Sequence, residues 1–250
     1  MTSKTRQSID PLEIRAHAST LPDGSALVYA VPGWDQLLHA TSGVMSVETQ
    51  RGTWVVPPNR ALWVPDGEAY QARMHGRVAV RALYLRAELG AMPAEVHVVN
   101  IPPLVRELIL HITSRPAPLD RRVPRDAHLI DVVLDELHEL PQAPLRLPQP
   151  QDPRARTLAA LLAESPAASL DELVARAGAS RRTFERLFVA ETGMSLARWR
   201  RQLRLLEALR LLGSGHSVTE VANLIGYATP SAFTAMFHAE LGQAPARYFT

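Results

Sequence analysis

The spacing of apolar and polar residues changes its period partway along the chain. Across residues 26–101, short apolar or alternating runs are separated by Gly, Pro, Asn and Asp. Short runs bounded by such turn residues are typical of β-strands in a sandwich or small barrel. From about residue 102 onward, apolar residues recur at helical spacing instead. The pattern predicts two domains: an N-terminal all-β barrel with added helices, and a C-terminal all-α domain.

The same pattern sets the boundaries that we expect. Residues 1–101 form the barrel, and residues 102–140 form helices whose apolar stripe either supports a dimer or packs back on the barrel. Residues 141–153 contain five prolines in thirteen positions, which predicts a semi-stiff polar linker. Residues 154–250 form the helical domain.

One motif occurs twice in the predicted helical domain. A Ser-x-x-Glu capping box opens each copy, at Ser169/Glu172 and at Ser217/Glu220. A glycine follows the first helix of each copy and ends it. Seven of the sixteen residues from 184 to 199 recur 49 positions later. We infer two related units, each made of a helix, a turn and a second helix.

Units of this kind place their second helix in the major groove of DNA, although a plain helical hairpin is the alternative. Charge favours DNA. Residues 169–210 hold nine Arg against five acidic residues, whereas the whole chain has 27 Lys and Arg against 25 Asp and Glu. A local basic excess is the electrostatic footprint of a protein that binds the phosphate backbone.

Composition narrows the class of protein further. The chain has no cysteine, so it has neither a disulfide framework nor a thiolate metal site. Residues 1–10 are polar and predict no signal peptide. No stretch approaches the roughly 20 apolar residues that a membrane span needs. We therefore expect a cytoplasmic protein without a membrane partner.

A longer pattern connects these features to a family. It reads Leu173-x-x-x-Ala177-Gly178-x-Ser180, Phe184-x-x-x-Phe188-x-x-x-x-Gly193 and Ile225-Gly226-Tyr227-x-x-x-Ser231-x-Phe233-x-x-x-Phe237. With this pattern, the C-terminal hundred residues resemble the AraC/XylS (arabinose-regulator) family of bacterial transcription factors. The N-terminal half is similar to the cupin-type sensor barrel of such regulators, through Pro57-Pro58-x-Arg60-Ala61-x-Trp63-Val64-Pro65-x-Gly67.

The resemblance implies a one-component regulator. A barrel would sense a small-molecule effector, and a long helix would join two helix-turn-helix units. The implied partners are double-stranded DNA and RNA polymerase, with a homodimer as a further option. The connecting helix, about residues 195–212, would be about 27 Å long. That length suits two reading helices about one DNA turn, near 34 Å, apart.

By match to the family, Arg182, Glu185 and Arg186 sit where base edges are read. Arginine pairs bidentately with guanine, and glutamate accepts from cytosine. The second unit offers only short, uncharged side chains there, so we expect the first unit to supply most of the base-specific energy; a merely solvated helix face is the alternative. The expected DNA-binding residues are Ser180, Arg181, Arg182, Thr183, Glu185, Arg186, Thr229, Pro230, Ser231 and Thr234.

Inside the barrel, several large side chains are candidates for an effector pocket with apolar walls and few polar groups. The same aromatic residues could instead simply fill the core. The candidates are Trp34, Gln36, Met45, Trp63 and Tyr70.

The histidines that the resemblance would place in a cupin metal site are missing. Residues 30–35 contain no His, and Tyr70 stands where a His would follow Pro65-Asp66-Gly67. We therefore expect no metal, no cofactor and no catalytic residue. A cupin enzyme with a helical accessory domain and a ligand-blind architectural DNA binder remain as alternative functions.

Overall fold

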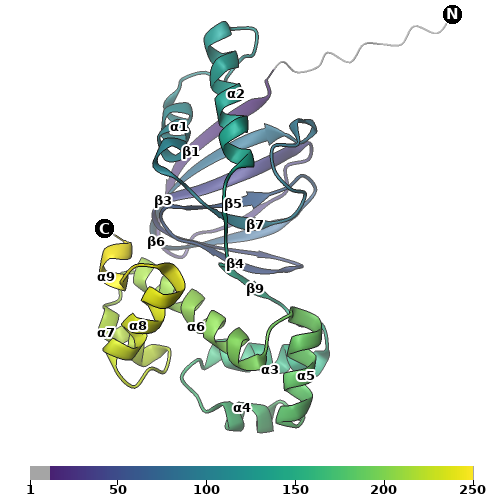
Figure 1. The fold of residues 1–250 in the computed structure, drawn as a ribbon, viewed down its shortest axis with the longest axis vertical. Helices are drawn as coiled ribbons and strands as arrows, with labels where there is room; N and C mark the ends of the chain where they lie inside the picture. Colours follow the sequence, from purple (N-terminus) through teal and green to yellow (C-terminus); the bar gives the residue numbers. More distant parts are fainter. Residues whose placement is uncertain (1–11, 250) are drawn as a thin grey trace, which may run out of the picture.

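Two long antiparallel strands form the centre of the N-terminal domain. The computed structural model describes residues 12–249, and the expectations for the first eleven residues lie outside that range. The strands are β1 (Ile14–Leu21), β2 (Ala26–Tyr29), β3 (Trp34–Thr49), β4 (Gly52–Val56), β5 (Arg60–Val64), β6 (Tyr70–Arg86) and β7 (His97–Asn100), with a 3-10 turn η1 (Ala87–Leu89) after β6. They form one antiparallel sheet ordered β1-β6-β3-β5-β7, to which β8 (Gln142–Ala143) adds next to β7, with β2 on β6 and β4 on β3 (Figure 1).

The sequence suggested turns at two glycines where the structure instead bends continuous strands. Gly43 lies inside β3 and Gly76 inside β6, both with positive φ, at 68° and 74°. The pairing of β3 with β6 shifts register between Ala40 and Val44. A local register shift with a left-handed glycine curves a strand without ending it. Each of these two strands therefore spans two of the short runs that the sequence pattern separates at a glycine.

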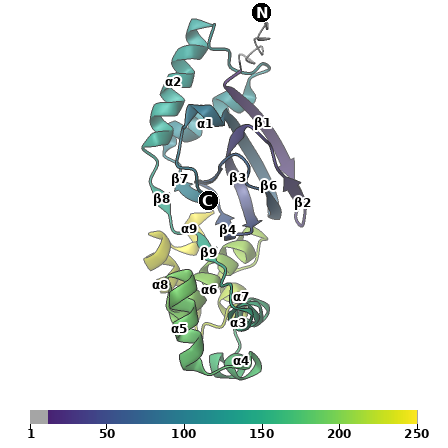
Figure 2. The same cartoon turned by 90° about the vertical axis from the view of Figure 1, so that its right-hand side faces the viewer.

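Two helices pack on one side of the sheet, as Figure 2 shows. They are α1 (Pro103–Ser114) and α2 (Pro124–His138). The stripe on α2 that we weighed for dimerisation, with Ile130, Val133 and Leu137, is buried together with α1 against the sheet. The packing alternative is thus what the structure of this chain shows. Leu104 of α1 is 53% exposed, whereas Val105 is buried.

The expected polar linker is wrong in its middle. Its middle forms β8 (Gln142–Ala143), which pairs with β7, and β9 (Arg146–Pro148), which pairs with β4. Leu145 and Leu147 are buried, at 0% and 5% exposure. These strands lie at sheet edges, where a proline interrupts no central ladder. Five prolines therefore coexist with sheet structure.

The C-terminal domain consists of short helices around one longer helix (Figure 1). The helices are α3 (Pro153–Glu164), α4 (Leu170–Arg176), α5 (Arg181–Thr192), α6 (Leu196–Gly213), α7 (Val218–Leu224), α8 (Pro230–Leu241) and α9 (Pro245–Tyr248). The predicted division into a sheet domain and a helical domain is confirmed.

Of the two predicted capping boxes, one is formed. Ser217 and Glu220 exchange both hydrogen bonds at the start of α7. Ser169 stands at the N-cap of α4, but its side chain accepts no hydrogen bond there. The first turn of α4 still carries Asp171 and Glu172, whose charges suit the positive end of the helix dipole. The motif therefore locates both helix starts, although the reciprocal bonds form only at α7.

Candidate functional site

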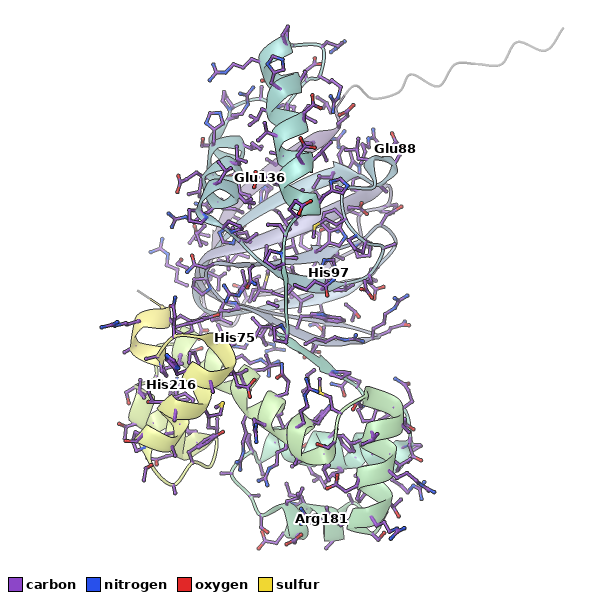
Figure 3. The ribbon with its side chains drawn as sticks, viewed as in Figure 1. His75, Glu88, His97, Glu136, Arg181 and His216 are labelled. Carbon is purple, nitrogen blue, oxygen red and sulfur yellow. The ribbon has the colours of Figure 1, made fainter. Side chains whose placement is uncertain are left out.

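The first half of α5 presents a basic surface outward. Ser180 caps the helix by accepting from the Thr183 backbone N–H at 3.2 Å. Phe184 and Phe188 are completely buried, so the rest of each turn faces away from the core. Arg181, Arg182 and Arg186 are exposed. Figure 3 shows Arg181 at the end of the helical domain far from the sheet.

The three exposed arginines differ in their partners. Arg181 bonds the Asp171 carboxylate at 3.0 Å and lies 3.9 Å from that of Glu185. Among residues 12–249, the side chains of Arg182 and Arg186 have no hydrogen bond or ion pair. An arginine without an internal partner loses no existing bond when it binds a phosphate or a guanine. Arg182 and Arg186 are therefore the side chains of α5 most available to an outside ligand.

Glu185 has a structural contact that the sequence did not reveal. Its carboxylate accepts the Leu196 backbone N–H, at the first residue of α6, over 3.3 Å. A negative charge at a helix start satisfies an unpaired donor and the helix dipole. This contact ties α5 to the beginning of α6 and competes with the base-reading role that we expected for Glu185.

Replacing Glu185 with Ala is expected to lower the free energy of unfolding by about 1 kcal/mol, the usual cost of a lost helix cap. Glu185→Gln keeps an acceptor and should lose less. Urea denaturation of the full chain measures both. An unchanged stability combined with an altered preference at one base position would assign Glu185 to DNA reading instead.

The corresponding part of α8 is built alike but carries no charge. Thr229 caps the helix by accepting from the Ala232 backbone N–H at 3.2 Å, and Pro230 occupies the first turn. Ser231 is exposed and Thr234 is half-buried, while Phe233 and Phe237 are completely buried. The two units thus share a scaffold and differ in the chemistry of the exposed surface.

Helix α6 connects the two units and lies between them in Figure 1. It has 18 residues, which corresponds to about 27 Å at 1.5 Å per residue. At its start, Trp199 packs edge-on against Phe188 of α5, with ring centroids 5.2 Å apart. Further along, the Arg204 guanidinium lies 5.7 Å from the centre of the Tyr227 ring. Packing of both units against one helix fixes their separation.

The same helix docks on the sheet domain. The Trp199 indole N–H donates to the Pro148 carbonyl at 2.8 Å, and Gln202 donates to the Pro144 carbonyl. At the other end, a Cβ added to Gly76 would overlap the Gly213 carbonyl oxygen, and one added to Gly213 would lie 2.5 Å from a methyl carbon of Val44. We call the contact of Val44, His75 and Gly76 with Gly213 the seam.

His75 belongs to the seam, and Figure 3 shows it where the sheet domain approaches the helical domain. Its Nε2 lies 2.8 Å from the Ser46 hydroxyl. Burial, and then the positive charge of Arg210, lower the pKa of His75 to about 4, with Asp23 opposing and Arg73 adding to the effect. Burial also lowers the pKa of His39. Both imidazoles are therefore neutral in the folded protein at pH 7.

This lowered pKa predicts acid sensitivity. Between pH 6.5 and about 4 the unfolded chain binds protons that folded His75 does not, so the free energy of unfolding should fall as the pH falls. Because His39 acts in the same direction, His75→Gln should flatten this slope without abolishing it. Denaturation at several pH values measures the slope. An identical slope in the variant would exclude a contribution from His75.

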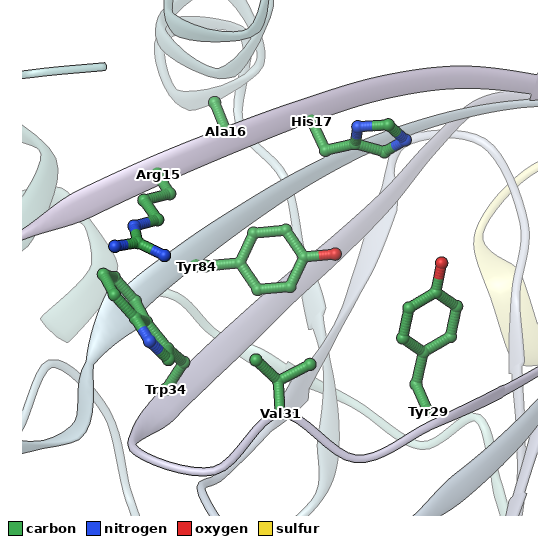
Figure 4. A pocket seen from close by; sticks show the side chains of 7 residues that line it. All are labelled: Arg15, Ala16, His17, Tyr29, Val31, Trp34 and Tyr84. Carbon is green, nitrogen blue, oxygen red and sulfur yellow. The ribbon is translucent and has the colours of Figure 1, made fainter.

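The sheet domain contains two adjoining pockets that share His17, Tyr29 and Tyr84, and we describe them together as one cavity with a mouth and a chamber. An outer mouth of about 380 Å³ is lined by Arg15, Ala16, His17, Tyr29, Val31, Trp34 and Tyr84, the residues drawn in Figure 4. An inner chamber of about 130 Å³ is lined by His17, Ser19, Leu21, Leu27, Tyr29, Leu38, Met45, Tyr70, Ala72, Met74, Val80, Ala82 and Tyr84.

Of the five pocket candidates, three line this cavity: Trp34, Met45 and Tyr70. Gln36 lies behind the wall and accepts the Tyr70 hydroxyl at 2.7 Å. Trp63 is misplaced, because it belongs to the core beneath α1 and α2 and donates to the Pro93 carbonyl. Its strand, β5, turns that residue toward the helices.

Sequence reasoning missed Arg15, His17, Tyr29 and Tyr84. Three of these residues lie on the short strands β1 and β2, which border the cavity by pairing with β6. The alternation of Ala16 with Arg15 and His17 was the available signal. It precedes residue 26, where the strand pattern that we recognised begins.

Two kinds of feature are absent from the described part of the chain. Within residues 12–249, no group of three or more His, Asp or Glu side chains is arranged to hold a metal ion. None of the helices in that range is long and apolar enough to cross a bilayer.

Comparison with known proteins identifies relatives of this chain. Residues 173–250 match a family described as a helix-turn-helix domain. The HTH-type transcriptional regulator NimR of Escherichia coli K12 is 35% identical over 215 residues, which cover 85% of this chain and 78% of NimR. RipA of Corynebacterium glutamicum is 37% identical over 105 residues, covering 41% of this chain and 32% of RipA. The DNA-binding domain of AdpA, solved with a target DNA, is 40% identical over 39% of this chain and 90% of that domain, with a TM-score of 0.36.

Proposed function

Because this chain belongs to the AraC/XylS family of helix-turn-helix transcription regulators, and so is a DNA-binding protein, we propose that it reads DNA with two helix-turn-helix units and responds to a small molecule in its sheet domain. The two units are α4 with α5 and α7 with α8. The observation that supports this most is that both reading helices, α5 and α8, are held by one 18-residue helix, α6.

The two units have different roles in DNA binding. Arg182 and Arg186 of α5 read base edges, since a guanidinium bonds guanine bidentately in the major groove. Ser180, Arg181 and Thr183 contact phosphates near the start of α5, where backbone N–H groups point outward. On α8, Thr229, Pro230, Ser231 and Thr234 position the protein on the backbone, because phosphate contacts orient without specifying sequence.

An effector signal reaches α6 through the seam. Met45 and Met74 line the inner chamber, and their chain neighbours Val44 and His75 lie at the seam with Gly213. A ligand that shifts the paired strands β3 and β6 at Met45 and Met74 therefore alters how α6 docks. The sheet domain acts as a cupin-type sensor in this proposal. The DNA-bound protein works in the cytoplasm and contacts RNA polymerase, and a second copy of the chain is a further partner.

Selection from a randomised duplex pool by the full chain tests this function. We expect enrichment of one site containing G·C pairs where α5 binds. The affinity for that site should fall as salt rises, because bound Arg side chains displace counterions. Failure to enrich any sequence at low salt would contradict the proposal.

A further inference from the structure

The two parts of the cavity meet at three residues with polar tips. His17, Tyr29 and Tyr84 line both the mouth and the chamber. Figure 4 shows the hydroxyl groups of Tyr29 and Tyr84 and the His17 ring around the same space. None of these three side chains hydrogen-bonds another residue within 12–249. We call them the polar rim.

The chamber inside the rim is apolar and small. Apart from the rim residues, its walls are mainly Leu, Met, Val and Ala side chains, and the Tyr70 hydroxyl is already bonded to Gln36. Its volume is about 130 Å³. A dry protein cavity of about 150 Å³ holds one benzene molecule. The chamber thus accommodates one aromatic ring or a short alkyl chain.

The charge around the rim favours an anion. Among residues 12–249, no Asp or Glu lines either part of the cavity, and Arg15 lies at the mouth, with its guanidinium 4.5 Å from the centre of the Trp34 ring. Burial, and then the proximity of Tyr29, raise the pKa of Tyr84, so its hydroxyl remains a hydrogen-bond donor. Donors and positive charge without a carboxylate suit an oxyanion.

We propose that this cavity binds a small organic monoanion, with an apolar end of at most one ring in the chamber and a carboxylate at the polar rim. His17, Tyr29 and Tyr84 donate to the carboxylate, and Arg15 contributes positive charge from the mouth. Binding stands on the cavity alone, whereas the role of the anion as an effector rests on the proposed function.

Titration calorimetry of the full chain at pH 7.5 tests this with five probes. Phenylacetate and hexanoate carry the proposed chemistry and distinguish a ring from an alkyl chain. Benzyl alcohol lacks the charge, benzylamine reverses it, and acetate lacks the apolar end. We expect at least one of the two larger acids to bind. Benzyl alcohol should bind roughly tenfold more weakly, as loss of a charged hydrogen bond predicts, and benzylamine and acetate should not bind.

Three variants test whether the acid binds in this cavity. Tyr84→Phe removes one rim donor that bonds no other residue and should weaken acid binding roughly tenfold. Leu27→Phe, on the short strand β2, should block the chamber and abolish acid binding. Tyr227→Phe makes the same chemical change in the helical domain and should leave acid binding unchanged.

Two results would overturn the inference: neither larger acid binds, or the amine and alcohol bind as tightly as the acids. Equal weakening by Tyr84→Phe and Tyr227→Phe would also overturn it. DNA affinity is measured on the same preparations. A protein that binds its DNA site but no acid disproves the ligand class alone, and one that binds acid but no DNA disproves the proposed function alone.

Discussion

Replacing Gly76 with Ala is expected to lower the free energy of unfolding of the full chain by roughly 2–5 kcal/mol. About 1–2 kcal/mol comes from an L-residue in the left-handed region, since φ at Gly76 is 74°. Another 1–3 kcal/mol comes from overpacking, because the new Cβ overlaps the Gly213 carbonyl oxygen. The total is a large share of the roughly 5–15 kcal/mol that stabilises a typical protein.

Gly67→Ala is the matched control for this substitution. Gly67 has a φ of 80°, and a Cβ added there would meet no atom within 4 Å. It should lose only the backbone part, about 1–2 kcal/mol. Equilibrium denaturation of both variants isolates the contact with α6. Equal losses would mean that the seam relaxes freely and transmits nothing between the domains.

Replacing Arg186 with Ala is expected to cost about 1–3 kcal/mol of specific DNA binding, a loss of roughly 5- to 150-fold in affinity. The reason is that Arg186 is exposed on α5 and has no bond within residues 12–249 to compensate. The loss should be confined to the selected site, because a base contact contributes little on unrelated DNA.

Two further variants serve as comparisons for Arg186→Ala. Arg156→Ala removes an exposed arginine from α3, outside the reading helices, and should change specific affinity little. Ser231→Ala on α8 should cost clearly less than Arg186→Ala. Gel-shift titrations on the selected site measure all three variants. Similar losses for Arg186→Ala and Ser231→Ala would disprove the division of work between the two units.

The helical domain could be predicted well because its signals are local. The capping box at Ser217, the glycines after α4 and α7 and the repeated phenylalanines each act within one helix or turn, and all are present in the structure. Family membership and DNA binding followed from the same residues, and both predictions are confirmed.

The sheet domain was harder to predict, because the extent and pairing of its strands depend on residues that are distant in the sequence. Gly43 and Gly76 look like turn residues, yet the long pairing of β3 with β6 carries the strands through them. Trp63 was assigned to the pocket, but which face of β5 meets the cavity depends on the pairing of that strand. The polar segment around Leu145 became sheet only because β4 and β7 offered free edges. Glu185 likewise gained its role from the start of α6.

The central claim is that α6 holds α5 and α8 one DNA turn apart. Inserting five base pairs between the two protected segments of the selected site turns them to opposite faces of the duplex, since one turn takes about 10–10.5 base pairs. Binding to the original, the five-pair insertion and a ten-pair insertion is measured with the full chain. If α6 is a rigid spacer, both insertions reduce affinity to that of a site retaining only the α5 segment. Undiminished affinity for either inserted site would contradict the claim.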